Sequence, residues 1–88
     1  MNSANPWLDE ISSALKGTAS GFILIDDKSG LCLDFRGEAR REDAAGLYLA
    51  SKTAVDKATG NGVVQYRGSR VLLRREKNCV LGIYTGTP

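Results

Sequence analysis

Apolar and polar positions repeat with two different periods along this chain, and each period predicts its own kind of element. Residues 22–25 are four consecutive apolar positions, partly β-branched, which is typical of a short strand buried on both faces. Residues 31–36 then alternate between large apolar and smaller or charged side chains, the period of two of a half-exposed strand. The intervening "DDKSG" predicts a hairpin turn, because Gly30 can supply a positive φ.

The period becomes helical from Glu38 to about Ala58. Acidic residues lie in the early turns and lysines in the later ones, which suits the helix dipole. Apolar and small residues occur on more than one side of this long central helix. One interpretation is a second contact surface. The other is an alanine-rich sequence that reflects helix propensity alone.

A shorter helical pattern precedes the first strand. Asn5 can cap the N-terminus of this helix, Pro6 suits its first position, and Gly17 suits its end. Its apolar stripe consists of Trp7, Ile11, Ala14 and Leu15. Such a short helix is marginal alone, so we expect it to dock on the rest of the domain.

Three strands close the chain, at residues 63–66, 70–75 and 79–85, separated by the tight turns "RGS" and "EKN". The predicted order is therefore α-β-β-α-β-β-β, with no helix after the last strand. We expect one α+β domain over residues 1–88, with a five-stranded antiparallel sheet and flexible ends at residues 1–4 and 86–88.

Composition narrows the function classes. The chain has 88 residues, 42% hydrophobic and 25% charged, with a net charge of +2, which excludes a disordered chain and a strongly basic nucleic-acid binder on bulk charge. Five basic residues against Glu76 nevertheless give residues 67–88 a local balance of +4: Arg67, Arg70, Arg74, Arg75 and Lys77. They are either solvated outward positions of strands or a basic patch that faces an acidic partner, a membrane or nucleic acid.

The sequence gives little support for catalysis, a metal or a cofactor. The chain has no histidine, and its serines lie in no nucleophile motif. Cys32 and Cys79 match no metal-binding spacing, so we interpret them as buried small hydrophobic residues. The pair Asp26 and Asp27 is the best metal candidate, but adjacent side chains point in different directions and both suit a turn. We expect no enzyme activity, no metal and no cofactor.

No signal peptide or membrane-spanning run is present in the sequence, so we expect an intracellular, soluble chain.

The order of these elements and three local phrases resemble the roadblock (LC7-like) family. "DDKSGL" followed by a strand ending in "FRG" resembles its first hairpin, "EDAAGLYLASKTAVDKA" its central helix, and the last three strands its closing meander. The likeness covers roughly residues 5–85. It is greatest for the small-subunit branch of the Ragulator complex and its fungal counterparts, which share "RG" before the helix and "AG" at its start.

The resemblance implies a roadblock/longin-like sandwich and a non-catalytic scaffold. Members pair through the central helix and the third strand. It implies a heterodimer with another roadblock-type subunit in a Ragulator/EGO-type complex, together with a larger scaffold subunit. Such complexes recruit Rag-type GTPases at the cytosolic face of lysosome, late endosome or vacuole membranes, through a lipidated partner, for amino-acid-dependent TOR signalling.

The residues agree with a pairing role at two places. In the family's strand order "VVQY" lies at a sheet edge, and it has none of the charges or prolines that blunt free edges. The central helix offers the second surface. The expected dimer interface is Gly62, Val63, Val64, Gln65 and Tyr66, with Ala45, Leu49, Ser51 and Val55.

Three other functions compete with this scaffold. One is a homodimeric roadblock module acting with a small GTPase or a motor complex, which has the same fold. Another is a basic nucleic-acid-binding module using "RGSRVLLRREK", although stacking platforms need more exposed aromatic residues than this segment offers. The third is a small enzyme, which the missing histidine disfavours.

Overall fold

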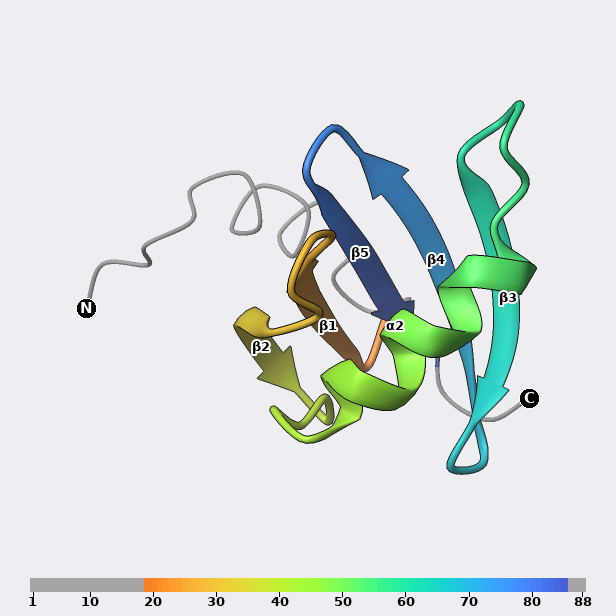
Figure 1. The fold of residues 1–88 in the computed structure, drawn as a ribbon. Coiled ribbons are helices and arrows are strands. Elements are labelled where there is room, and N and C mark those ends of the chain that lie inside the picture. Colours follow the sequence, from red (N-terminus) through yellow and green to blue (C-terminus); the bar gives the residue numbers. More distant parts are fainter. Residues whose placement is uncertain (1–18, 86–88) are drawn as a thin grey trace.

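The computed structural model describes residues 19–85, which form one five-stranded antiparallel sheet with a helix across one face (Figure 1). The sheet order is β2-β1-β5-β4-β3. The elements are β1 (Gly21–Asp26), β2 (Cys32–Gly37), α2 (Asp43–Ala54), β3 (Asn61–Tyr66), β4 (Ser69–Glu76) and β5 (Cys79–Tyr84). The α+β class and the five antiparallel strands are therefore confirmed.

The predicted fold with a short N-terminal helix and a long central helix is wrong for the part of the chain that the structure describes. Residues 19–85 contain one helix, and it has 12 residues instead of the predicted span from Glu38 to about Ala58. The helix predicted near residues 5–17 and the flexible ends 1–4 and 86–88 lie outside the described residues. The two-helix roadblock/longin-like sandwich is thus not the architecture observed here.

The helix ends early because of a local side-chain interaction. Val55 has extended backbone angles, φ −83° and ψ 123°. Asp56 then folds the chain into a turn, since its Oδ1 accepts hydrogen bonds from the N–H groups of Ala58 (2.7 Å) and Thr59 (3.3 Å). Aspartate that bonds to nearby N–H groups offers the backbone an alternative to helix. Residues 55–58 therefore lie outside the helix, although their sequence pattern is helical.

The helix begins at a buried carboxylate. Asp43 is 1% exposed, and its Oδ2 accepts a hydrogen bond from the Arg40 N–H at 3.1 Å, which holds the residues just before α2 against its first residue. The same oxygen accepts hydrogen bonds from the Tyr84 hydroxyl (2.6 Å) and Arg67 Nη2 (2.9 Å). Asp43 therefore ties the start of α2 to β5 and to the β3–β4 turn.

These contacts keep Asp43 ionised. Burial raises the pKa of this carboxyl, but hydrogen bonds from Tyr84 and Arg67 outweigh burial and hold the pKa below its ordinary value of 3.8. The pKa of Tyr84 is raised by burial and by the neighbouring carboxylate. Tyr84 therefore stays protonated and keeps donating.

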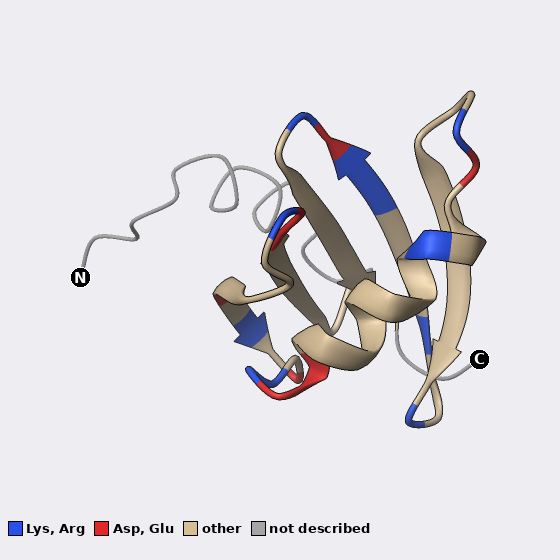
Figure 2. Cartoon of the chain, viewed as in Figure 1, with Lys and Arg blue, Asp and Glu red and all other residues tan. Residues whose placement is uncertain are grey.

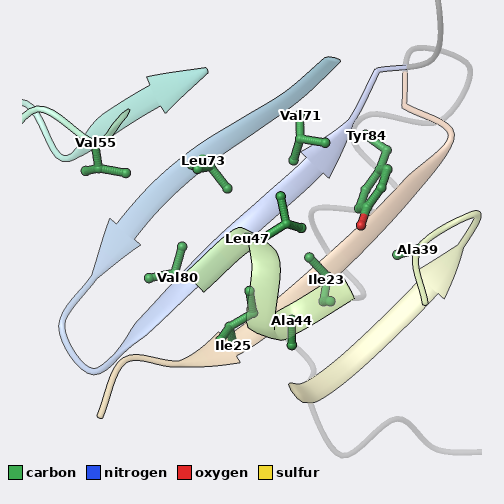
Figure 3. Close-up of a cluster of buried hydrophobic side chains, with 10 residues drawn as sticks. All are labelled: Ile23, Ile25, Ala39, Ala44, Leu47, Val55, Val71, Leu73, Val80 and Tyr84. Atoms are coloured by element: carbon green, nitrogen blue, oxygen red, sulfur yellow. The ribbon is translucent and has the colours of Figure 1, made fainter. Parts of the chain in front are cut away.

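The main core lies between α2 and the sheet (Figure 3). Leu47 of the helix is fully buried over Ile23 and Ile25 of β1 and Val80 of β5. Gly62 is needed where the end of α2 crosses β3, because a Cβ there would overlap the carbonyl oxygen of Ala54. The end of the helix thus packs directly on the backbone of β3.

The opposite side of the sheet, which we call the far face, carries a second apolar group. The strand register aligns one residue from each of four strands in a row: Val63, Leu72, Ile83 and Phe22. Val63 is 56% exposed at one end of this row and Phe22 is 4% exposed at the other. An apolar stripe therefore runs from the β3 edge across β4 and β5 to β1.

We expect Tyr84→Phe to lower the free energy of unfolding by about 1.5–3 kcal/mol, since it removes a hydrogen bond to a buried charged acceptor. Chemical denaturation at pH 7 measures the change. A loss below about 0.5 kcal/mol would contradict the role given to this contact.

The pH dependence of stability provides a second prediction. Because the pKa of Asp43 is lowered in the folded state, its contribution is complete above its ordinary pKa and disappears as the pH falls through the folded pKa. Asp43→Asn should therefore be less stable than the wild type at pH 7 and lose less stability on acidification. Denaturation curves from pH 7 down to about pH 2 check both points. Parallel profiles would contradict the assignment.

Candidate protein-interaction edge

The sheet has two edge strands, β2 and β3. An edge strand exposes backbone N–H and C=O groups that can pair with a strand from another chain. Proteins prevent such pairing with bulges, charges or local contacts on the edge. The two edges of this sheet differ in these devices.

The β2 edge has features that prevent a strand of another chain from pairing with it. Its register against β1 shifts at Leu33, which produces a bulge. The Asp34 carboxylate accepts a hydrogen bond from the Phe35 N–H at 2.8 Å and lies 3.5 Å from the Arg36 guanidinium. Backbone groups along β2 point alternately toward β1 and away from it, and the Phe35 N–H points away. The Asp34 side chain therefore already binds the N–H group that a new strand would need.

The β3 edge is open at Val63 and Gln65. The turn to β4 is a two-residue turn with positive φ at Arg67 (49°) and Gly68 (80°), so Tyr66 and Ser69 form a hydrogen-bonded pair. Because hydrogen-bonded and non-hydrogen-bonded pairs alternate along the two strands, the backbone groups of Val64 point toward β4 and those of Val63 and Gln65 point outward.

The outward groups of Asn61 are used within the domain. Its carbonyl accepts a hydrogen bond from the Asp56 N–H at 2.9 Å, and its N–H donates to Thr59 Oγ1 at 3.2 Å. The open part of the edge is therefore short. Val63 and Gln65 present four backbone groups to which no other strand of residues 19–85 is paired.

The predicted interface residues of β3 divide between the two faces of the sheet. Val64 and Tyr66 are half-buried against the core beneath α2. Val63 and Gln65 are exposed and lie on the far face. Gly62 lies under the end of the helix. Val63 is thus the apolar side chain that an incoming strand would meet first.

The predicted interface residues in and just after the helix are also divided, between the surface and the core. Ala45 and Leu49 are exposed, Leu49 by 70%. Ser51 and Val55 are 0% and 6% exposed and face the core. Ser51 also donates a hydrogen bond to the Tyr48 carbonyl at 2.7 Å. Of these four predicted residues, only Ala45 and Leu49 therefore offer surface, because burial excludes Ser51 and Val55 from contact with a partner.

The basic residues of the predicted patch do not gather in one place (Figure 2). Arg67 pairs with Asp43 at 2.9 Å and Arg75 pairs with Asp27 at 3.1 Å, both on the helix side of the sheet. Lys77 lies in the β4–β5 turn. Arg70 and Arg74 remain, two exposed residues on the far face of β4 with Leu72 between them.

The aspartate pair acts within the fold. The Asp26 carboxylate accepts hydrogen bonds from the Ser29 N–H at 2.8 Å and hydroxyl at 2.7 Å, and these bonds lower its pKa. This is the turn geometry that the sequence predicted. Asp27 instead binds Arg75 of β4, a contact that sequence reasoning missed. In residues 19–85, no group of three or more acidic, cysteine or histidine side chains is placed to hold a metal ion.

The two cysteines are free and half-buried, less buried than predicted. Burial raises the pKa of both the Cys32 and Cys79 thiols. They therefore stay protonated near neutral pH, and a protonated thiol is a poor nucleophile.

Comparison with known proteins gives no family assignment. No protein-family model matches the chain, and no curated protein matches its sequence. In the part of the chain that the structure describes, no helix is long and apolar enough to cross a membrane. The geometry of the β3 edge and the resemblance in sequence are therefore the two indications of function.

Proline substitutions test which backbone groups point outward. Val63→Pro removes an N–H that makes no bond to β4, so we expect only a small loss of stability in the isolated chain. Val64→Pro removes an N–H that bonds to β4, and should lower the free energy of unfolding by about 3 kcal/mol or more. Thermal denaturation compares the two variants. Equal losses would contradict the assignment.

Proposed function

We propose that this chain is a non-catalytic scaffold subunit that pairs with another protein by strand addition at β3. The observation that carries the proposal is the difference between the two edges. The β2 edge has a bulge, two charges and a bonded amide, whereas β3 has no charge and two outward-facing residues. An apolar open edge promotes aggregation unless another chain pairs with it.

The exposed surface of α2 extends this candidate interface. The end of α2 packs on Gly62 of β3, so the helix and the edge strand lie together in the fold. Leu49 is 70% exposed on the outer side of that helix, and large exposed apolar side chains are a sign of interaction sites where they cluster. A partner that pairs with β3 and reaches over α2 would cover Ala45 and Leu49.

The resemblance in sequence names a biological setting for such pairing. It supports a place in a Ragulator/EGO-type complex, with a second roadblock-type subunit and a larger scaffold subunit as partners. In that setting the pair would help to recruit Rag-type GTPases to lysosome or vacuole membranes, held there by a lipidated partner, for TOR signalling. This setting is a proposal drawn from the quoted motifs, whereas the pairing mode is argued from the edge.

A homodimer is the second candidate. Two copies of β3 can pair antiparallel because the open segment has no charge that would repel its own copy. Sedimentation of the purified chain at several concentrations separates the two candidates. A monomer that associates when a recombinant roadblock-type Ragulator subunit is added supports the heterodimeric scaffold. A stable dimer of the chain alone supports the homodimer.

The test of the edge compares two lysine substitutions at sites of equal exposure. Val63 is 56% exposed on β3 and Leu33 is 55% exposed on β2. We expect Val63→Lys to weaken pairing by about tenfold or more, because a charge at a strand–strand seam loses hydration without gaining a partner.

Leu33→Lys is the matched control and should leave pairing unchanged. Sedimentation of each variant, with circular dichroism to confirm the fold, measures both effects. If Leu33→Lys abolishes pairing and Val63→Lys does not, the wrong edge has been assigned.

A further inference from the structure

The far face next to the β3 edge contains a groove that no predicted function uses. Its volume is about 460 Å³, and its lining includes Val63 of β3, Leu72 of β4 and Ile83 of β5. Asn61 and Arg74 line one end. The groove therefore combines an apolar floor with a cation and opens beside the outward backbone groups of Val63 and Gln65.

Two arginines flank the apolar floor. Arg70, Leu72 and Arg74 alternate along β4, and all three side chains are exposed on the far face. Their partners across β3 are Gln65, Val63 and Asn61, in that order, none of which is charged. The two arginines lie four positions apart along the strand, a distance of about 13 Å.

The two cations are only weakly neutralised within the described residues. Arg74 forms an ion pair with Glu76, but these side chains are 53% and 39% exposed, and exposed pairs contribute little. Arg70 has no ion pair among residues 19–85, where its carbonyl oxygen accepts hydrogen bonds from the N–H and the hydroxyl of Thr85. This part of the far face therefore carries a cation on either side of an apolar centre: Arg70, which has no ion pair among residues 19–85, and Arg74, whose charge is shared with the exposed Glu76.

We infer that the strand added to β3 carries a large apolar residue facing the groove and an acidic residue two positions away on each side of it. On a strand, residues i−2, i and i+2 lie on the same face and span the same 13 Å or so as Arg70 to Arg74. With the apolar residue beside Val63, one acidic residue lies beside Gln65. The other lies near Asn61, at the end of the open edge, because the Asn61 carbonyl already accepts a hydrogen bond from the Asp56 N–H. Long acidic side chains there can reach across β3 toward Arg70 and Arg74, which lie opposite Gln65 and Asn61 on the second strand along, about 10 Å away.

The occupant is an acidic peptide segment, because only a peptide satisfies both features of the site. The outward N–H and C=O groups of Val63 and Gln65 require a partner backbone, which neither a lipid nor a nucleic acid supplies. The arginines add a preference for carboxylates on one face of that backbone. This inference rests on the proposed strand addition and specifies the partner's sequence pattern.

Capped synthetic peptides, added to the full chain, test the inference by nuclear magnetic resonance titration. The probe is Thr-Glu-Thr-Val-Thr-Glu-Thr, in which both glutamates share a face with valine. One control replaces the glutamates with lysine. A second control, Glu-Thr-Thr-Val-Thr-Thr-Glu, has the same composition but places the glutamates on the opposite face.

We expect the first peptide to shift the amide signals of Val63 and Gln65 and to bind about tenfold tighter than either control. The double variant Arg70→Glu and Arg74→Glu should reverse this preference and favour the lysine peptide. Arg41→Glu, an exposed arginine outside the groove, should change neither affinity. Raising the salt concentration should reduce the preference, since these charges are exposed.

The outcomes separate the inference from the proposed function. If all three peptides shift Val63 and Gln65 with equal affinity, strand addition stands and the acidic pattern is overturned. Tighter binding of a peptide of the chain's own "NGVVQY" segment would also overturn it, in favour of a second copy. If no peptide shifts these amides and Val63→Lys leaves pairing intact, strand addition itself fails.

Discussion

The buried carboxylate of Asp43 is the contact on which the arrangement of this domain depends. It accepts hydrogen bonds from the Arg40 N–H just before α2, from Tyr84 at the end of β5 and from Arg67 in the β3–β4 turn. Arg67 has a positive φ of 49°, which a non-glycine residue adopts rarely, and its ion pair with Asp43 helps to hold that conformation. One side chain thus links the position of the helix on the sheet to the turn that joins β3 to β4.

The geometry of that hairpin decides which side of β3 is open. A two-residue turn fixes the register with β4, and the register points the backbone groups of Val63 and Gln65 away from the sheet. At the other edge, Asp34 bonds to the neighbouring amide and a bulge interrupts the ladder. The sheet therefore has one edge that is satisfied internally and one that is not. A scaffold that assembles by strand addition needs this asymmetry, because two open edges would allow uncontrolled growth.

The strands could be predicted because their patterns depend on local burial, and period two is visible in residues 31–36. The length of α2 could not be predicted. Asp56 ends the helix by accepting hydrogen bonds from nearby N–H groups, and the resulting turn differs from a longer helix by only a small free energy. The role of Asp43 was also missed. Its burial depends on Tyr84 and Arg67, which are 41 and 24 positions away in the chain.

The candidate site was predicted in part for a similar reason. The absence of charge in β3 is visible in the sequence, so the open edge could be anticipated from composition. Which side chains point toward the sheet depends on how the helix is rotated about its own axis, and the sequence does not determine that rotation. Ser51 and Val55 were therefore predicted at the surface but are buried. The basic residues near the end of the chain alternate along β4, so the pleat divides them between two faces and two different roles.

Amide hydrogen exchange of the chain, at a concentration where it is monomeric, tests the open edge most directly. We expect the amides of Val63 and Gln65 to exchange rapidly, whereas those of Gly62, Val64 and Tyr66 are protected by β4. Protection of Val63 and Gln65 equal to that of Val64 in the monomer would show that the edge is already covered, and would contradict the account.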